Sequence, residues 1–69
     1  MSKEITAKET GERLRKLRES RRQADVAEAV GITTMAISQY EQGLRIPQDR
    51  IKVRLANYYN VSVESIFFA

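Results

Sequence analysis

The sequence predicts an all-α fold of five short helices, and three observations support this prediction. The chain has only 69 residues, so it forms one domain with a small core. Apolar residues recur at three- and four-residue spacing along most of the chain, which is the period of a helix. All 3 glycines and the single proline lie where they can begin or end helices. Five helices joined by tight turns leave no length for a sheet.

The first helix is predicted to begin near Thr10, where the periodicity starts. Leu14 and Leu17 are three residues apart, and the segment RLRKLR around them consists of strong helix formers. The residues before Thr10 are mostly polar. We therefore expect a flexible N-terminal arm at residues 1–9 and a folded domain at residues 10–69.

Two helices in the middle of the chain are predicted to be joined by a tight turn. The second helix is expected over Gln23–Val30, with Gly31 as its C-terminal stop. Thr33 is a candidate N-cap for a third helix over about Thr34–Gln42, and Gly43 ends that helix.

The last two helices are marked by a proline and a serine. Pro47 precedes a fourth helix, expected over about Gln48–Tyr59, whose apolar residues keep helical spacing. Ser62 is the candidate N-cap of a short fifth helix, and Glu64 in its first turn suits the positive end of the helix dipole.

The segment QADVAEAVGITTMAISQYEQ, from Gln23 to Gln42, has the pattern of a helix-turn-helix. Two short helices that cross steeply need a small residue where their backbones approach, and Ala27 supplies it. The turn between them needs a residue that tolerates positive φ, and Gly31 supplies it. The remaining pattern positions are apolar, as a shared core requires, and they are Val26, Val30, Ile32, Ile37 and Tyr40. Because all these positions agree in one window, the segment indicates a helix-turn-helix.

Five blocks along the chain extend this pattern. GERLRKLRES, DVAEAVGIT, AISQYEQG, RIP and NVSVESIFF resemble successive blocks of the phage-repressor and Cro-like (XRE-type) helix-turn-helix family. The resemblance covers about residues 10–68. It implies a compact five-helix, lambda-repressor-like domain that binds double-stranded DNA, with its third helix in the major groove. The expected function is that of a transcriptional regulator, and of a repressor in particular.

The third helix has an outward face suited to contacting bases. If Ile37 and Tyr40 point inward, the opposite face is neutral and able to form hydrogen bonds. Glutamine pairs with adenine N6 and N7, serine and threonine donate or accept, and methionine can lie against a thymine methyl group. We hypothesise base contacts by Thr34, Met35, Ser38 and Gln39, with Gln39 foremost. The alternative is that these side chains only solvate a helix.

Phosphate contacts are expected at helix N-termini and on the basic flanks of the motif. Gln23 and Thr33 begin the second and third helices, whose N–H groups favour anions. The family resemblance adds backbone contacts by Gln42 and Arg45. Residues 1–22 carry eight basic and four acidic side chains, residues 23–43 none and three, and residues 44–69 four and two, for a net charge of +3. The motif itself has no cation, so the candidate flanking contacts are Arg21, Arg22, Arg45, Arg50 and Lys52.

One ion pair is expected inside the domain. Arg18 follows Leu14 by four residues and Leu17 by one, which places it on the buried side of the first helix, where an unpaired guanidinium is costly. The family resemblance pairs it with Glu41 of the third helix. The alternative is two separately solvated charges.

The connection between the first two helices departs from the family pattern. Only Glu19, Ser20, Arg21 and Arg22 separate Arg18 from Gln23, about two residues fewer than is usual in the family, and its customary glycine and apolar plug are missing. Either the turn is unusually tight or the chain as written lacks residues here.

The composition argues against an enzyme and against a metal or cofactor. The chain has no Cys and no His, so thiolate, imidazole and zinc chemistry are excluded. No apolar run approaches the ~20 residues of a membrane span, and we expect a cytoplasmic protein without a small-molecule ligand.

The alternative function is an antitoxin or other protein-binding module on the same scaffold, with contacts by Tyr58, Tyr59, Phe67 and Phe68. Phe68 is also the candidate contact of a weak homodimer, since consecutive helical residues cannot both face the core. A palindromic operator would suit such a dimer.

Overall fold

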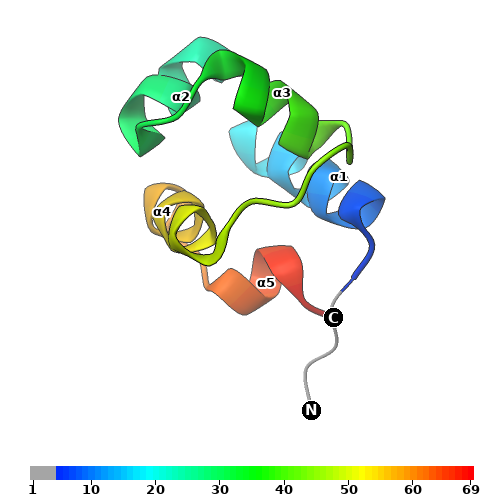
Figure 1. Ribbon diagram of the computed structural model, residues 1–69. Coiled ribbons are helices and arrows are strands. Elements are labelled where there is room, and N and C mark those ends of the chain that lie inside the picture. The colour runs from blue at the N-terminus through cyan, green and yellow to red at the C-terminus, as the bar shows by residue number, and fades with distance from the viewer. Residues whose placement is uncertain (1–4) are drawn as a thin grey trace.

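A computed structural model describes residues 5–69, and over this range the chain folds into five helices (Figure 1). The helices are α1 (Ala7–Arg18), α2 (Gln23–Val30), α3 (Thr34–Glu41), α4 (Asp49–Tyr59) and α5 (Val63–Phe67). The predicted all-α architecture of five helices is therefore confirmed.

Helix α1 begins earlier than the sequence predicts. Thr6 is its N-cap, and the Thr6 hydroxyl oxygen accepts a hydrogen bond from the N–H of Glu9 at 3.1 Å. This cap lets residues 7–9, which the sequence predicts to belong to the arm, form the first turn of the helix. Residues 1–4 lie outside the described part of the chain, so an arm there stays a prediction.

The other helix boundaries follow the predicted caps closely. The Thr33 and Ser62 hydroxyl oxygens accept hydrogen bonds from the N–H groups of Ala36 and Ser65, at 3.0 and 3.1 Å. Gly31 ends α2 with φ +83° and ψ +36°, the left-handed conformation that the turn requires. Helix α4 starts at Asp49, one residue later than expected, because Gln48 is its N-cap.

The core lies between the helix-turn-helix and the other three helices. Helix α3 packs against α1 and α2, α4 packs against α2 and α5, and α5 closes onto α1. In Figure 1, α2 and α3 form the upper part of the molecule, and α4 and α5 the lower part. The buried apolar side chains come from all five helices and are Leu14, Val26, Ala27, Val30, Ile37, Tyr40, Ile51, Leu55, Ala56, Ile66 and Phe67.

Gly11 lies inside α1, contrary to the expectation that every glycine begins or ends a helix, and it allows α1 and α3 to approach closely. Gly11 is buried, and a Cβ atom added there would lie 2.7 Å from the carbonyl oxygen of Tyr40 and overlap that of Glu41. Any side chain at this position would force the two helices apart. The backbone of α3 therefore packs directly against the backbone of α1 at Gly11.

The short connection between α1 and α2 is a tight turn with a strained residue. The N–H of Arg21 donates to the carbonyl of Arg18 at 3.0 Å, and Glu19 has φ +51° and ψ −120°. These angles are those of the first central residue of a type II′ turn, a position that glycine favours. The chain thus joins the two helices without the glycine and apolar plug that are usual in the family, and the backbone of Glu19 is strained as a result.

Phe68 lies partly in the core, so the expectation that its side chain is exposed is wrong, whereas a dimer contact by Phe68 stays a prediction. Helix α5 ends at Phe67, and Phe68 is extended with φ −131° and ψ 159°. The rule against consecutive inward residues therefore does not apply, and Phe68 packs against the core beside the buried Phe67. Within residues 5–69, no helix has the length and apolar character needed to span a membrane.

Candidate nucleic-acid interface

Helix α3 has a packing face and an outward face, as its sequence predicts. Ile37, Tyr40 and Glu41 are buried, whereas Thr34 and Met35 are exposed, and 69% of the Met35 surface is accessible. The two other predicted base-contacting residues, Ser38 and Gln39, are half-buried. The four residues predicted to contact bases therefore all lie on α3, and none of them is one of its buried residues.

An ion pair joins α1 to the C-terminal end of α3. Nε and Nη2 of Arg18 donate to the two carboxylate oxygens of Glu41, at 2.6 and 2.9 Å. The Glu41 side chain is 2% exposed and that of Arg18 is 18% exposed. The hydrogen bond that Arg18 donates to Glu41 raises the pKa of Arg18 above its ordinary value. The pair predicted from the sequence is thus present, with the two-point geometry of a strong Arg–carboxylate contact.

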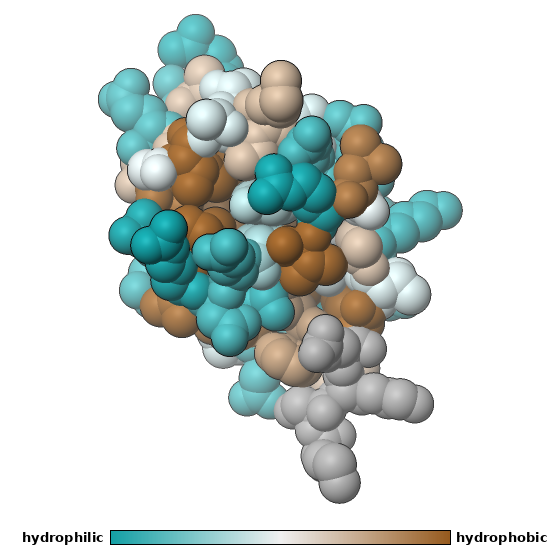
Figure 2. Space-filling view, viewed as in Figure 1, coloured by the Kyte–Doolittle hydropathy of each residue, from teal (hydrophilic) through white to brown (hydrophobic). Residues whose placement is uncertain are grey.

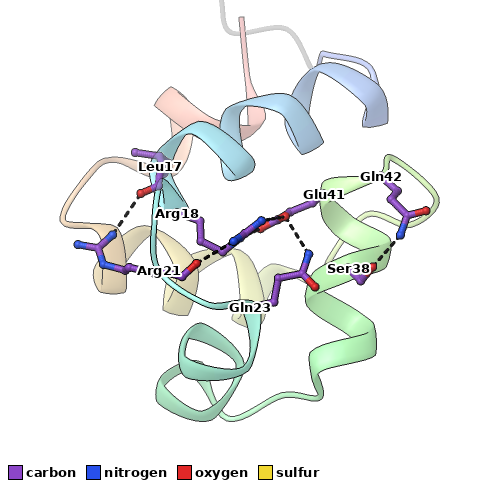
Figure 3. Close-up of polar contacts among 7 residues, drawn as sticks. All are labelled: Leu17, Arg18, Arg21, Gln23, Ser38, Glu41 and Gln42. Carbon is purple, nitrogen blue, oxygen red and sulfur yellow. Dashed lines mark hydrogen bonds and ion pairs between the residues drawn. The ribbon is translucent and has the colours of Figure 1, made fainter.

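Gln23 and the tight turn complete a network around this pair (Figure 3). Nε2 of Gln23 donates to Oε1 of Glu41 at 3.0 Å, and Nη1 of Arg18 donates to the carbonyl of Arg21 at 2.7 Å. The buried carboxylate therefore binds the end of α1, the turn and the start of α2 to α3. Burial, with the Glu41 carboxylate nearby, raises the pKa of Tyr59 to about 12.

Two hydrogen bonds connect side chains on and beside the outward face of α3. Nε2 of Gln42 donates to the Ser38 hydroxyl oxygen at 2.6 Å (Figure 3). Nη1 of Arg45 donates to Oε1 of Gln39 at 3.1 Å, and the Arg45 guanidinium carbon lies 5.8 Å from the centroid of the Tyr40 ring. Gln42 and Arg45 thus lie beside the residues predicted to contact bases.

The two helix N-termini of the motif differ in how they are capped. The Thr33 hydroxyl caps α3, whereas α2 has Arg22 at its N-cap position and no side-chain cap hydrogen bond. Since the Gln23 amide is bound to Glu41, the part of Gln23 best placed for a phosphate is its backbone N–H.

The predicted basic contacts occupy three different environments. Arg22 is exposed and pairs with Asp25 at 3.2 Å. Arg21 donates to the carbonyl of Leu17 at 3.1 Å, and its guanidinium lies over the Tyr58 and Tyr59 rings. Arg50 is exposed in the first turn of α4.

Lys52 is the basic residue that the structure does not bring to this interface. Its side chain is only 13% exposed, and its ammonium lies 5.4 Å from the Phe67 ring and 5.9 Å from the Phe68 ring. Those rings belong to α5 and the residue after it, on the side of α4 away from α2. Lys52 therefore packs against these rings and is not placed to bind a phosphate at this interface.

The family of the chain follows from comparison with known proteins. A family model described as a helix-turn-helix domain matches residues 9–66. The chain belongs to this family. The helix-turn-helix domain thus takes in all five helices of the fold except the first two residues of α1 and the last residue of α5.

Solved structures share this fold. The P22 c2 repressor, solved in complex with synthetic operator 9T, is 30% identical; the match covers 83% of this chain and 89% of that one, with a TM-score of 0.80. The restriction-modification controller protein C.AhdI from Aeromonas hydrophila is 24% identical over 88% of this chain and 96% of that one, with a TM-score of 0.81. The SOS-response repressor LexA from Eubacterium rectale, 20% identical over 96% and 72% of the two chains, has a TM-score of 0.84. No curated protein matches the sequence.

Sequence reasoning missed three features of this helix-turn-helix domain. The bond from Gln23 to Glu41 has no sequence signal, because it depends on how α2 is placed relative to α3. The Arg45–Gln39 contact depends on the path of the loop after α3. The close approach at Gly11 had a signal, since an interior helical glycine that costs stability often serves packing. In the described residues, no cluster of three or more His, Cys, Asp or Glu could hold a metal ion.

Proposed function

We propose that this protein binds double-stranded DNA sequence-specifically and regulates transcription, with α3 in the major groove. The observation that carries the proposal is the neutral outward face of α3, held on a rigid base by the Arg18–Glu41–Gln23 network. Support comes from the P22 c2 repressor, which shares the fold at 30% identity and was solved with operator DNA. The base contacts are assigned to Thr34, Met35, Ser38 and Gln39.

Affinity in this proposal comes from residues around the outward face. The recognition helix carries no Lys or Arg, so the attraction to phosphate falls to its flanks and to helix N-termini. The candidate contacts are Gln23, Thr33, Gln42, Arg21, Arg22, Arg45 and Arg50. Lys52 is left out, since its ammonium lies over the rings of Phe67 and Phe68.

Regulation would work by occupancy of an operator, most simply as a repressor that blocks polymerase in the cytoplasm. A symmetric dimer would place two α3 helices in half-sites about 34 Å apart on a palindrome. A single domain of this size makes few contacts, so the monomer should bind weakly and with strong salt dependence.

Site selection from random duplexes, followed by a salt titration, tests the proposal. One sequence should be enriched, and the affinity should fall steeply as salt rises. Gln39→Ala should lose about 1–3 kcal/mol at one base position, whereas Arg50→Ala should weaken binding to all sequences alike. If no sequence is enriched and binding does not weaken with salt, the DNA-binding proposal fails.

The protein-binding alternative has less support. The aromatic residues predicted to form its contact surface are largely covered. Phe67 is only 3% exposed, and Tyr58, Tyr59 and Phe68 are half-buried. Among residues 5–69, the large apolar side chains that are exposed lie elsewhere: Met35, Leu44, Ile46 and Val53. On the face in Figure 2, apolar side chains alternate with hydrophilic ones instead of forming one broad patch.

A further inference from the structure

The amide of Gln39 is held by Arg45 before any DNA is bound. Arg45 donates to Oε1 of Gln39 at 3.1 Å and lies over the ring of the buried Tyr40. The N–H of Leu44 donates to the carbonyl of Gln39 at 2.9 Å, which holds the loop before Arg45 against the end of α3. Arg45 is therefore held by its guanidinium, and the residue before it is held at its backbone.

This contact determines which end of the Gln39 amide faces away from Arg45. A guanidinium has donors only, so it bonds the amide oxygen and leaves the NH2 group directed elsewhere. A charged donor also polarises the amide, which strengthens its N–H donors and weakens its oxygen as an acceptor for a second partner. Gln39 is thus prepared to donate hydrogen bonds more than to accept them.

Ser38, the neighbouring polar residue, is biased in the same direction. Its hydroxyl oxygen accepts a hydrogen bond from Gln42 at 2.6 Å, and its hydroxyl hydrogen remains available to donate. Both polar side chains therefore favour base edges that present acceptors.

We infer that Arg45 is a positioning residue that makes Gln39 select guanine over adenine at its base pair. Guanine presents two acceptors in the major groove, N7 and O6, and both suit a donating NH2 group. Adenine presents N7 but also the N6 amino group, which needs the amide oxygen that Arg45 occupies. The inference rests on the proposed function, because it concerns how α3 discriminates bases.

Binding of the full chain to single-base variants of its selected site tests the inference. The position contacted by Gln39 is first found as the one where Gln39→Ala loses discrimination. The unaltered protein should prefer guanine to adenine there by about fivefold to tenfold, near the low end for one side chain. Arg45→Met should shift that preference toward adenine, and Arg45→Lys, which keeps a cationic donor, should retain part of the guanine preference. The matched control is Arg50→Met, which removes an exposed charge and should lower affinity without changing any base preference.

The possible results separate the inference from the proposed function. If Arg45→Met weakens all variants equally, or if the unaltered protein prefers adenine, Arg45 does not set the preference and the inference is wrong. If Gln39→Ala alters discrimination at no position although the protein selects a sequence, the inference fails and the proposed function stands. If no sequence is selected at all, it is the proposed function that fails.

Discussion

Removing one partner of the Arg18–Glu41 pair should cost a large part of the stability of this domain. Chains of this size are stable by about 3–10 kcal/mol. Arg18→Met leaves a carboxylate that is 2% exposed and that keeps, among residues 5–69, one side-chain hydrogen bond, from the Gln23 amide. Loss of one partner from a buried pair costs about 3–5 kcal/mol, and we expect about 3 because the guanidinium itself is 18% exposed.

Urea unfolding followed by far-ultraviolet circular dichroism measures this effect. With an m-value of about 1 kcal/mol/M, the midpoint should fall by about 3 M, or the variant should be unfolded without urea. The double variant Arg18→Met/Glu41→Leu should recover most of the loss, because no buried charge remains. Arg22→Met, which breaks the exposed Arg22–Asp25 pair, should leave the midpoint unchanged. Equal midpoints for Arg18→Met and Arg22→Met would refute the reasoning from burial.

Three further predictions concern the turn, the helix contact and a tyrosine. Glu19→Gly should stabilise the domain by about 1 kcal/mol through release of backbone strain, raising the thermal midpoint by several degrees, while Glu19→Ala should give no such gain. Gly11→Ala should destabilise by at least about 2 kcal/mol in urea unfolding despite its higher helix propensity, because a Cβ there overlaps the α3 backbone; an unchanged midpoint would show that α1 and α3 separate freely. Burial raises the pKa of Tyr59 from 10.0 to about 12, so the folded state loses stability as pH rises from 10 toward 12. Phenolate absorbance should show Tyr59 titrating above its ordinary pKa, and Tyr59→Phe should remove that component together with its share of the alkaline loss.

The helix boundaries were predictable where a capping residue adjoins an apolar period. Thr33, Ser62 and Gly31 each determine one boundary through a local hydrogen bond or a positive φ, and the structure agrees at each. Thr6 makes the same kind of cap but lies in a polar segment, so hydrophobic periodicity did not reveal it. Local signals thus predicted the fold well.

The site was predictable only in part, because several contacts depend on tertiary placement. Glu19 has no sequence preference for a positive φ; the short connection imposes it. Lys52 counted as a cation in the sequence, yet the packing of α4 against α5 places its charge over aromatic rings. The outward face of α3 was predictable since Ile37 and Tyr40 determine which side points inward.

The separation of the two faces of α3 has a consequence for changing what the domain recognises. Its buried residues are Ile37, Tyr40 and Glu41, none of which belongs to the proposed base-contacting set. The four outward positions can therefore be randomised together in a library without loss of the buried network. Such a library would have to retain or vary Arg45 as a fifth position, because the loop residue and the helix residue it holds act as one unit of specificity.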